Sequence, residues 1–189
     1  MLLAILLAFG APPATPSARA AALCEAALAQ IGVTKVYDPS YVKIDYPGGD
    51  VPVDRGVCTD VLVRAYRAVG QDLQRLVHED MRLHFSAYPQ MWGLTKPDPN
   101  IDHRRVANLQ CFFRRRGAEL PIRGFPAAYE PGDLVAWDLN GKGLLHIGIV
   151  VEPADRPGTR WIVHNIGAGA QLEDGLFAWR IIGHYRYGL

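Results

Sequence analysis

Apolar residues recur at intervals of three and four along several segments of the first two thirds of the chain, and this spacing predicts helices. The strongest pattern covers residues 59–69, whose apolar positions fall on one helical face and which ends at Gly70. An Ala-rich stretch predicts a helix over 21–31 that ends at a glycine. Two weaker patterns predict helices over 72–86 and 106–116.

From residue 131 onward the pattern changes to short apolar runs separated by turn residues, which is typical of buried strands. The predicted strands are 134–137, 146–151, 161–165 and 181–187, and Asn140-Gly141 predicts a hairpin turn between the first two. Residues 36–52 predict only short extended pieces, because Pro and Gly interrupt them. The expected fold is α+β, with N-terminal helices packed on a C-terminal antiparallel sheet.

The N-terminus has the pattern of an export signal. Its first nine residues are apolar but too few to span a bilayer, which takes about 20. A Pro-rich stretch follows and ends in Ala18-Arg19-Ala20, a small-residue cleavage pattern, although no Lys or Arg precedes the apolar part. We expect residues 1–20 to be a signal peptide, with an uncleaved tail as the alternative. Residues 21–189 are then one domain with an insert at 71–130, periplasmic or secreted and without a membrane span.

Composition narrows the class of protein. Apolar residues make up 49% of the chain and charged residues 21%, as in an ordinary globular protein. The net charge of +1 argues against nucleic-acid binding. No cofactor and no metal site is expected, and the protein is expected to be a monomer. One of the three cysteines must be unpaired, and Cys24 and Cys111 either form a disulfide or remain as buried apolar residues.

Cys58 stands where a glycine-bearing turn leads into the helix predicted for 59–69. The partial positive charge of a helix start favours thiolate over thiol, so this position predicts a nucleophile. His146 and His164 lie on two successive predicted strands, and the order Cys, His, His predicts a general base and a residue that orients it. Backbone N–H groups of Cys58 and Thr59, with a tyrosine from 37–46, are candidates for binding the oxyanion. The alternative is an inert cysteine with structural histidines.

Two families share motifs with this chain. The helix-start cysteine, the strand His146-Ile147-Gly148-Ile149-Val150 and the strand entry Gly132-Asp133-Leu134-Val135 resemble NlpC-type papain-like cysteine peptidases. That resemblance implies a papain-like fold and an exported peptidase or amidase that cuts amide bonds in the stem peptides of bacterial peptidoglycan. Gly56-Val57-Cys58-Thr59-Asp60 and the run 164–169 resemble more closely a bacterial exported family catalogued only as a domain of unknown function.

The chain departs from the NlpC pattern in two places. Val57-Cys58-Thr59-Asp60 stands where that family has Asp-Cys-Ser-Gly, and the insert at 71–130 lengthens the separation of cysteine and histidine. The insert contains Asp102-His103-Arg104-Arg105, which is able to clamp a peptide carboxylate or, alternatively, to cap a helix with exposed charges. The predicted substrate-binding residues are Asp54, Tyr46, Asp102, His103, Arg104 and Asn165.

Two rival functions remain open. A metal hydrolase would use His103, His146 and His164 as ligands with Asp102 nearby, but these residues lack the spacing of zinc sites. A non-catalytic module would hold a wall peptide without cutting it. Substitution of Cys58 separates the three functions, because only the thiol enzyme needs the sulfur for turnover.

Overall fold

The computed structural model describes residues 17–189. Within them the helices are α1 (Ala18–Leu28), α2 (Cys58–Ala68), α3 (Leu73–His84) and α4 (Val106–Arg115). The strands are β1 (Val36–Tyr37), β2 (Arg55–Gly56), β3 (Leu134–Asp138), β4 (Leu145–Val151), β5 (Trp161–Asn165), β6 (Ala170–Glu173) and β7 (Arg180–Tyr185). Most of the predicted leader lies outside the described residues, and its last three residues form the first turn of α1.

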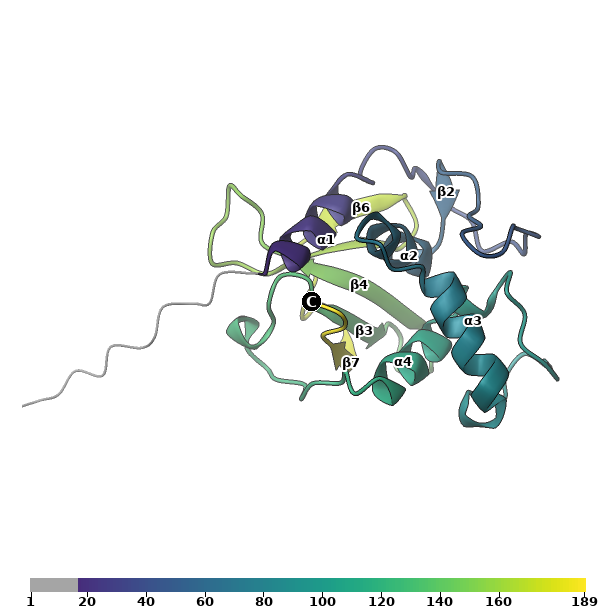
Figure 1. Cartoon of the computed structure of the whole chain (residues 1–189). Helices are drawn as coiled ribbons and strands as arrows, with labels where there is room; N and C mark the ends of the chain where they lie inside the picture. The colour runs from purple at the N-terminus through teal and green to yellow at the C-terminus, as the bar shows by residue number, and fades with distance from the viewer. Residues whose placement is uncertain (1–16) are drawn as a thin grey trace, which may run out of the picture.

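The five strands β3 to β7 form one sheet in the order β6-β5-β4-β3-β7. All its pairings are antiparallel, and β1 and β2 make a separate two-stranded parallel ladder. Figure 1 shows α1, α2 and α4 over one side of this sheet, with α3 beyond α2. The predicted α+β class, with helices first and an antiparallel sheet second, is therefore confirmed.

Both faces of the sheet are covered, which explains why β4 is almost continuously apolar. Ile147, Ile149 and Val151 point into the main core, which they share with α1, α2 and α4. Val150 points the other way, into a smaller core that contains Trp137 and Tyr129. Successive residues of a strand point to opposite faces, so His146 shares the second face with Val150. The His146 and Trp137 rings lie side by side with centroids 5.8 Å apart, which agrees with this placement.

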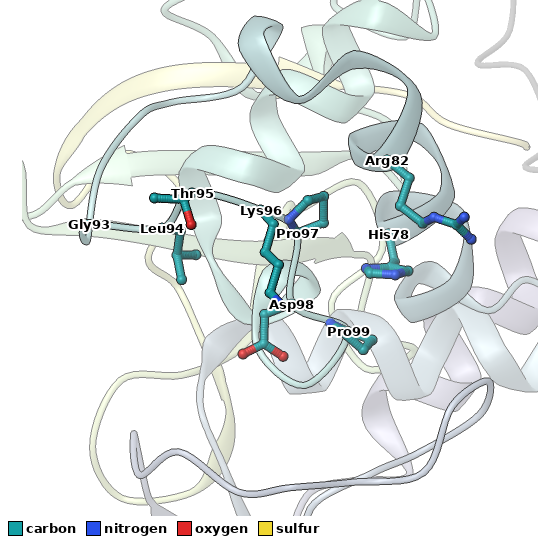
Figure 2. A pocket seen from close by; sticks show the side chains of 9 residues that line it. All are labelled: His78, Arg82, Gly93, Leu94, Thr95, Lys96, Pro97, Asp98 and Pro99. Atoms are coloured by element: carbon teal, nitrogen blue, oxygen red, sulfur yellow. The ribbon is translucent and has the colours of Figure 1, made fainter.

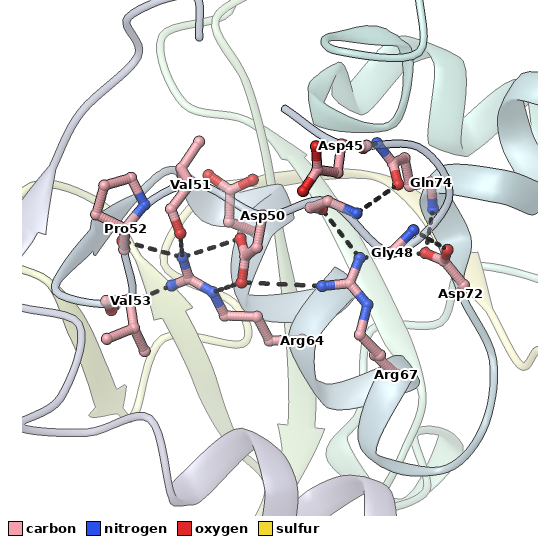
Figure 3. A network of polar contacts seen from close by, with 12 residues as sticks. Asp45, Gly48, Asp50, Val51, Pro52, Val53, Arg64, Arg67, Asp72 and Gln74 are labelled. Carbon is pink, nitrogen blue, oxygen red and sulfur yellow. Dashed lines mark hydrogen bonds and ion pairs between the residues drawn. The ribbon is translucent and has the colours of Figure 1, made fainter. Parts of the chain in front are cut away.

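A network of arginines fixes the long connection between β1 and α2 (Figure 3). Arg64 of α2 forms a bidentate pair with Asp50 at 2.8 and 3.1 Å and also donates to backbone carbonyls of that connection. Arg67 bonds Asp72 at 3.2 Å and the carbonyl oxygen of Gly49 at 3.1 Å. The connection is thereby held against α2, although it has little regular structure of its own.

The predicted elements differ from the observed ones mainly at their ends. The four helices and the four predicted strands are present, but β6 was not predicted, and residues 166–169 form its hairpin with β5. All three cysteines are buried and free, so no disulfide joins Cys24 to Cys111. Within residues 17–189 no helix combines the length and the apolar character needed to cross a membrane.

Candidate active site

Cys58 is the first residue of α2, and the turn before it is built around Asp60. The Asp60 carboxylate accepts the backbone N–H of Val57 at 2.7 Å, which caps the helix from its third position. Gly56 makes room for this cap, because a Cβ atom there would stand 2.8 Å from Asp60 Oδ2. The Gly-Val-Cys-Thr-Asp run therefore fixes where the helix starts and puts the thiol in its first turn.

Arg104 holds the other side of that turn. Its guanidinium forms a buried ion pair with Asp60, with Nε 2.9 Å from Oδ1 and Nη2 3.0 Å from Oδ2. Its remaining donors bond the carbonyl oxygens of Ser40 at 2.9 Å and Asp38 at 3.1 Å. The predicted role of Arg104 was to clamp a substrate carboxylate, yet its hydrogen-bonding capacity is used within the protein. Arg104 belongs to the insert, and through these bonds it fixes the position of the start of α2.

The Cys58 thiol is only 4% exposed, and burial raises its pKa to about 12. Backbone hydrogen bonding from Ile147, Thr59 and Cys58 itself favours the thiolate, while the charge of Asp60 disfavours it. The sequence predicted a thiolate favoured by the helix start. In the resting protein this expectation is wrong, because desolvation of a charged sulfur outweighs the helix N-terminus and the backbone donors.

His146 and His164 are joined directly, and an acid completes the chain. His146 Nε2 lies 2.8 Å from His164 Nδ1, and His164 Nε2 lies 3.1 Å from Glu173 Oε2. The three residues come from the neighbouring strands β4, β5 and β6. The structure thus brings the two predicted histidines together and adds Glu173 as the group that binds the outer nitrogen.

The register of the strands explains how the two rings meet. Ile149 pairs with Val163, so the next position along the ladder puts His164 opposite Gly148 and not opposite His146. A Cβ atom at Gly148 would stand 3.2 Å from His164 Cβ and 2.5 Å from Ile162 Cγ2. Because Gly148 has no side chain, the His164 ring has space to reach its diagonal neighbour His146.

Burial, together with the smaller effect of the neighbouring His164, lowers the pKa of His146 to about 3. Burial also lowers the pKa of His164, although Glu173 opposes that shift. His146 is therefore a neutral imidazole at neutral pH, as expected from its apolar flanks. Its Nδ1 atom makes no hydrogen bond within residues 17–189, so this nitrogen is free to accept a proton.

Cys58 and His146 are related through the backbone of β4. Among the groups that lower the pKa of the Cys58 thiol is the backbone of Ile147, the residue that follows His146. The thiol belongs to the core on the helical face, whereas the His146 ring packs against Trp137 and Trp179 on the other face. In the resting state described by residues 17–189, the thiol and the imidazole form no direct hydrogen bond.

A cavity of about 300 Å³ opens beside Cys58. Its walls come from the segment after β1, from the start of α4 and from the turn before β4. They include Tyr37, Trp92, Arg105 and Leu145, of which Trp92 and Leu145 belonged to no predicted site. This cavity is the place where a substrate would reach the sulfur.

Asp102 and His103 lie behind the cavity and do not line it. Asp102 is fully buried, accepts the backbone N–H of Asp98 at 2.7 Å and lies 3.3 Å from His78 Nδ1. Burial raises the pKa of Asp102 to about 6, while His78 opposes the shift. His103 is buried as well, which lowers its pKa to about 3, and the charge of Arg104 adds to this. Both residues therefore organise the insert.

His78 also borders a second cavity, of about 590 Å³, between α3 and the loop 93–99 (Figure 2). Figure 2 shows Asp98 and Lys96 on the loop side and His78 with Arg82 on the helix side. Asp98 accepts hydrogen bonds from Tyr41 and Asn100. The bond from Tyr41 holds the preceding segment against this loop. The lining residues of this cavity include neither Cys58 nor His146.

The three other predicted substrate-binding residues have structural neighbours. Asn165 donates from Nδ2 to the carbonyl oxygen of Gly56 at 2.9 Å, which ties β5 to the turn before Cys58. Tyr46 packs edge-on against the His78 ring, with centroids 5.0 Å apart. Asp54 forms an exposed ion pair with Arg55. Tyr37, and not Tyr46, is the tyrosine of the 37–46 segment that lines the Cys58 cavity.

Across residues 17–189 no group of three or more His, Cys, Asp or Glu side chains is arranged to hold a metal ion. The charges that act on His103 are those of Arg104, Asp72, Arg67 and Asp50, whereas His146 and His164 bond each other. The ligand set of the rival metal hydrolase is therefore not assembled in the described part of the chain.

Comparison with known proteins decides the family. The family model described as "Domain of unknown function (DUF1287)" matches residues 24–187. The chain belongs to the DUF1287 family. "Uncharacterized protein YijF" of Escherichia coli (strain K12) is 55% identical over 166 residues, which are 88% of this chain and 80% of the relative. No solved structure matches the chain.

Membership in the DUF1287 family confirms the closer of the two predicted resemblances. The motifs that carried it have structural explanations, since Gly56 and Asp60 build the start of α2 and Asn165 ties β5 to the same turn. Glu173 was missed, because an acid next to a turn looks like a surface residue in sequence, whereas Arg105 belonged to the predicted carboxylate clamp of residues 102–105.

Proposed function

We propose that this DUF1287 protein is an exported cysteine hydrolase of the NlpC type, with a papain-like arrangement of helix and sheet. Its substrates are amide bonds in the peptides of bacterial peptidoglycan, and it works in the periplasm or after secretion. The observation that carries the proposal is the buried chain from His146 through His164 to Glu173, which begins one residue before Ile147, whose backbone lowers the pKa of the Cys58 thiol. A buried chain of this kind holds an imidazole in one orientation and tautomer.

The proposed reaction starts from a neutral thiol and a neutral imidazole. When a substrate fills the cavity, the Cys58 proton moves to His146 Nδ1 and the sulfur attacks the amide carbonyl carbon. His146 then gives the proton to the leaving amine as the C–N bond breaks. Water, activated by the same nitrogen, hydrolyses the acyl-thioester. In the resting state the thiol and the imidazole lie on opposite faces of β4, so the proposed proton transfer requires the His146 ring to turn toward the cavity when substrate binds.

The oxyanion has candidate donors on the other side of the sulfur. The first N–H groups of α2 point out of the helix start, where the helix dipole favours negative charge. Tyr37 lines the same cavity, and burial together with the charges of Cys58 and Asp60 raises its pKa, which keeps the phenol protonated. A protonated phenol is able to donate to a developing oxyanion.

The test is turnover of a defined mixture of peptidoglycan stem peptides, followed by mass spectrometry, for the wild type, Cys58→Ala, His146→Ala and Cys111→Ala. The proposal expects product from the wild type and from Cys111→Ala, whose buried thiol lies away from the cavity. It expects none from the other two. Product from Cys58→Ala would refute the thiol mechanism.

A binding module is the second candidate, and one observation favours it. The raised pKa of Cys58 and the lack of a hydrogen bond to His146 are typical of a protonated, unactivated thiol. A module would hold the stem peptide in the same cavity without turnover. Binding by wild type and Cys58→Ala with equal affinity, together with no product from either, would establish this second function.

A further inference from the structure

The cavity beside Cys58 contains a positive charge that the proposed reaction does not use. Arg105 lines the cavity, and its guanidinium carbon lies 4.0 Å from the ring centroid of Trp92. Within residues 17–189 no carboxylate lies within ion-pair distance of this guanidinium, and Nε is buried without a hydrogen-bond partner. Buried polar groups of proteins nearly always have partners, so this one requires an explanation.

Its neighbour in sequence provides the contrast. Arg104 lines the same cavity, but its charge is compensated by Asp60 and its donors are occupied. Of these two consecutive arginines, Arg104 holds the start of α2, and Arg105 has N–H donors available for a ligand. Burial lowers the pKa of Arg105, while the charge of Asp102, which forms no ion pair with it, opposes the shift.

Trp92 is held so that its ring covers Arg105. Its φ is 63°, in the left-handed region that a bulky side chain avoids, and it is the one non-glycine residue of the described chain with a positive φ. Such strain persists where the surroundings enforce it, and it concentrates at ligand sites. The flat contact leaves the edge of the guanidinium, which carries the N–H donors, free of the ring.

The rest of the cavity suits an acidic peptide. Apolar side chains supply much of its lining, among them Met91, Ile101 and Leu145. An apolar pocket with a single unpaired charge selects a ligand that has an apolar body and one opposite charge. The first turn of α4, at Val106 and Ala107, borders the same space and adds the positive end of a helix dipole.

We propose that Arg105 is the carboxylate anchor of the Cys58 cavity, binding a carboxylate of the peptide substrate through paired N–H···O bonds while Trp92 packs on the guanidinium. This inference rests on the proposed function and narrows its substrate class to peptides with a free carboxylate near the amide that is cut. Arg105 is then a specificity residue, distinct from the groups that act on the amide.

The experiment measures binding without turnover. Calorimetry in a Cys58→Ala background compares two synthetic peptides, a stem tetrapeptide with free carboxylates and the same peptide with every carboxylate amidated. We expect the acidic peptide to bind at least about tenfold more tightly, the size of a charge-assisted hydrogen bond. Arg105→Gln should abolish this preference and Arg105→Lys should keep part of it. Arg123→Gln, which removes an exposed arginine far along the chain, should leave it unchanged.

The outcomes separate this inference from the proposed function. If the preference persists in Arg105→Gln, if that variant weakens both peptides equally, or if neither peptide binds the parent, the anchor is refuted. Equal weakening would mean that Arg105 only packs on Trp92. If the preference depends on Arg105 while the wild type cuts no peptide, the anchor stands and the hydrolase fails. Thermal melting of each variant verifies that it is folded.

Discussion

Two buried thiols, those of Cys58 and Cys24, lie near different backbone groups of strand β4. Near its start, the backbone of Ile147 lowers the pKa of Cys58, and farther along the carbonyl oxygen of Val150 accepts from Cys24 Sγ at 3.6 Å. An N–H donor stabilises a thiolate, whereas a carbonyl oxygen stabilises the protonated thiol. The two cysteines lie on neighbouring helices over the same face of the sheet (Figure 1), and Cys58 borders a cavity.

The pKa of the resting thiol does not separate these two positions. Burial raises the pKa of both Cys24 and Cys58 to about 12. At Cys24 the charges of Asp133 and Glu25 contribute to the rise and the backbone of Gly132 opposes it, while at Cys58 the charge of Asp60 contributes and backbone donors oppose it. The difference between the two sulfurs is the cavity that Cys58 borders. Under the proposed function, reactivity depends on groups that act when substrate is bound.

The largest expected effect is on turnover. Cys58→Ala should reduce hydrolysis of stem peptides on the order of 10⁴-fold, because no other group replaces the nucleophile. Cys24→Ala should leave turnover within about twofold, since its sulfur faces a backbone carbonyl and no cavity. Chromatography of the peptide products measures both. Equal loss in the two variants would erase the proposed distinction between the thiols.

The two helix starts should also differ in stability. Asp60→Ala removes one partner of a buried ion pair and should cost about 3 to 5 kcal/mol in the free energy of unfolding. Ser17 caps α1 through a single hydrogen bond to the N–H of Ala20 at 3.0 Å, so Ser17→Ala should cost only about 1 kcal/mol. Urea denaturation measures both values. A similar cost at the two starts would show that Arg104 and Asp60 add little to the position of α2.

His146, near the start of β4, should make the free energy of unfolding depend on pH. The pKa of His146 is about 3 in the folded protein and near 6.5 when unfolded, so the unfolded chain binds more protons between these values. Stability is then complete above about pH 6.5 and falls by up to about 1.4 kcal/mol per pH unit toward pH 3. His146→Gln should flatten this slope, measured by thermal melting, and His84→Gln, at an exposed position, should not. An unchanged slope in His146→Gln would mean that His146 is already solvated.

Much of this fold follows from pattern. The predicted strand 161–165 agrees with β5, and the predicted helix 106–116 differs from α4 by one residue, because strong apolar periodicity and clear turn residues bound them. Strand β6 was missed since its Ala170-Gln171-Leu172-Glu173 run has only one large apolar residue. Its pairing with β5, and not its own composition, makes it a strand.

The site was less accessible to sequence reasoning. Spacing on strands indicated that His146 and His164 are close, but the register that lets them touch depends on Gly148. Sequence alone does not reveal burial, so the shift of the Cys58 pKa to about 12 was not foreseen. Nor does it reveal which of Arg104 and Arg105 faces Asp60, because adjacent side chains diverge according to a backbone that only the fold defines.

The smallest expected effect is a difference in alkylation. At pH 7.5 iodoacetamide should modify Cys58 about tenfold faster than Cys24, because Cys58 borders a cavity while Cys24 must wait for local opening. Both should react more slowly than in urea, where the thiols regain ordinary pKa values. Peptide mass spectrometry gives the two rates in one sample, and Cys111 serves as an internal reference. Faster modification of Cys24 would mean that its sulfur is more accessible than that of Cys58. This result would remove the basis for treating Cys58 as the nucleophile.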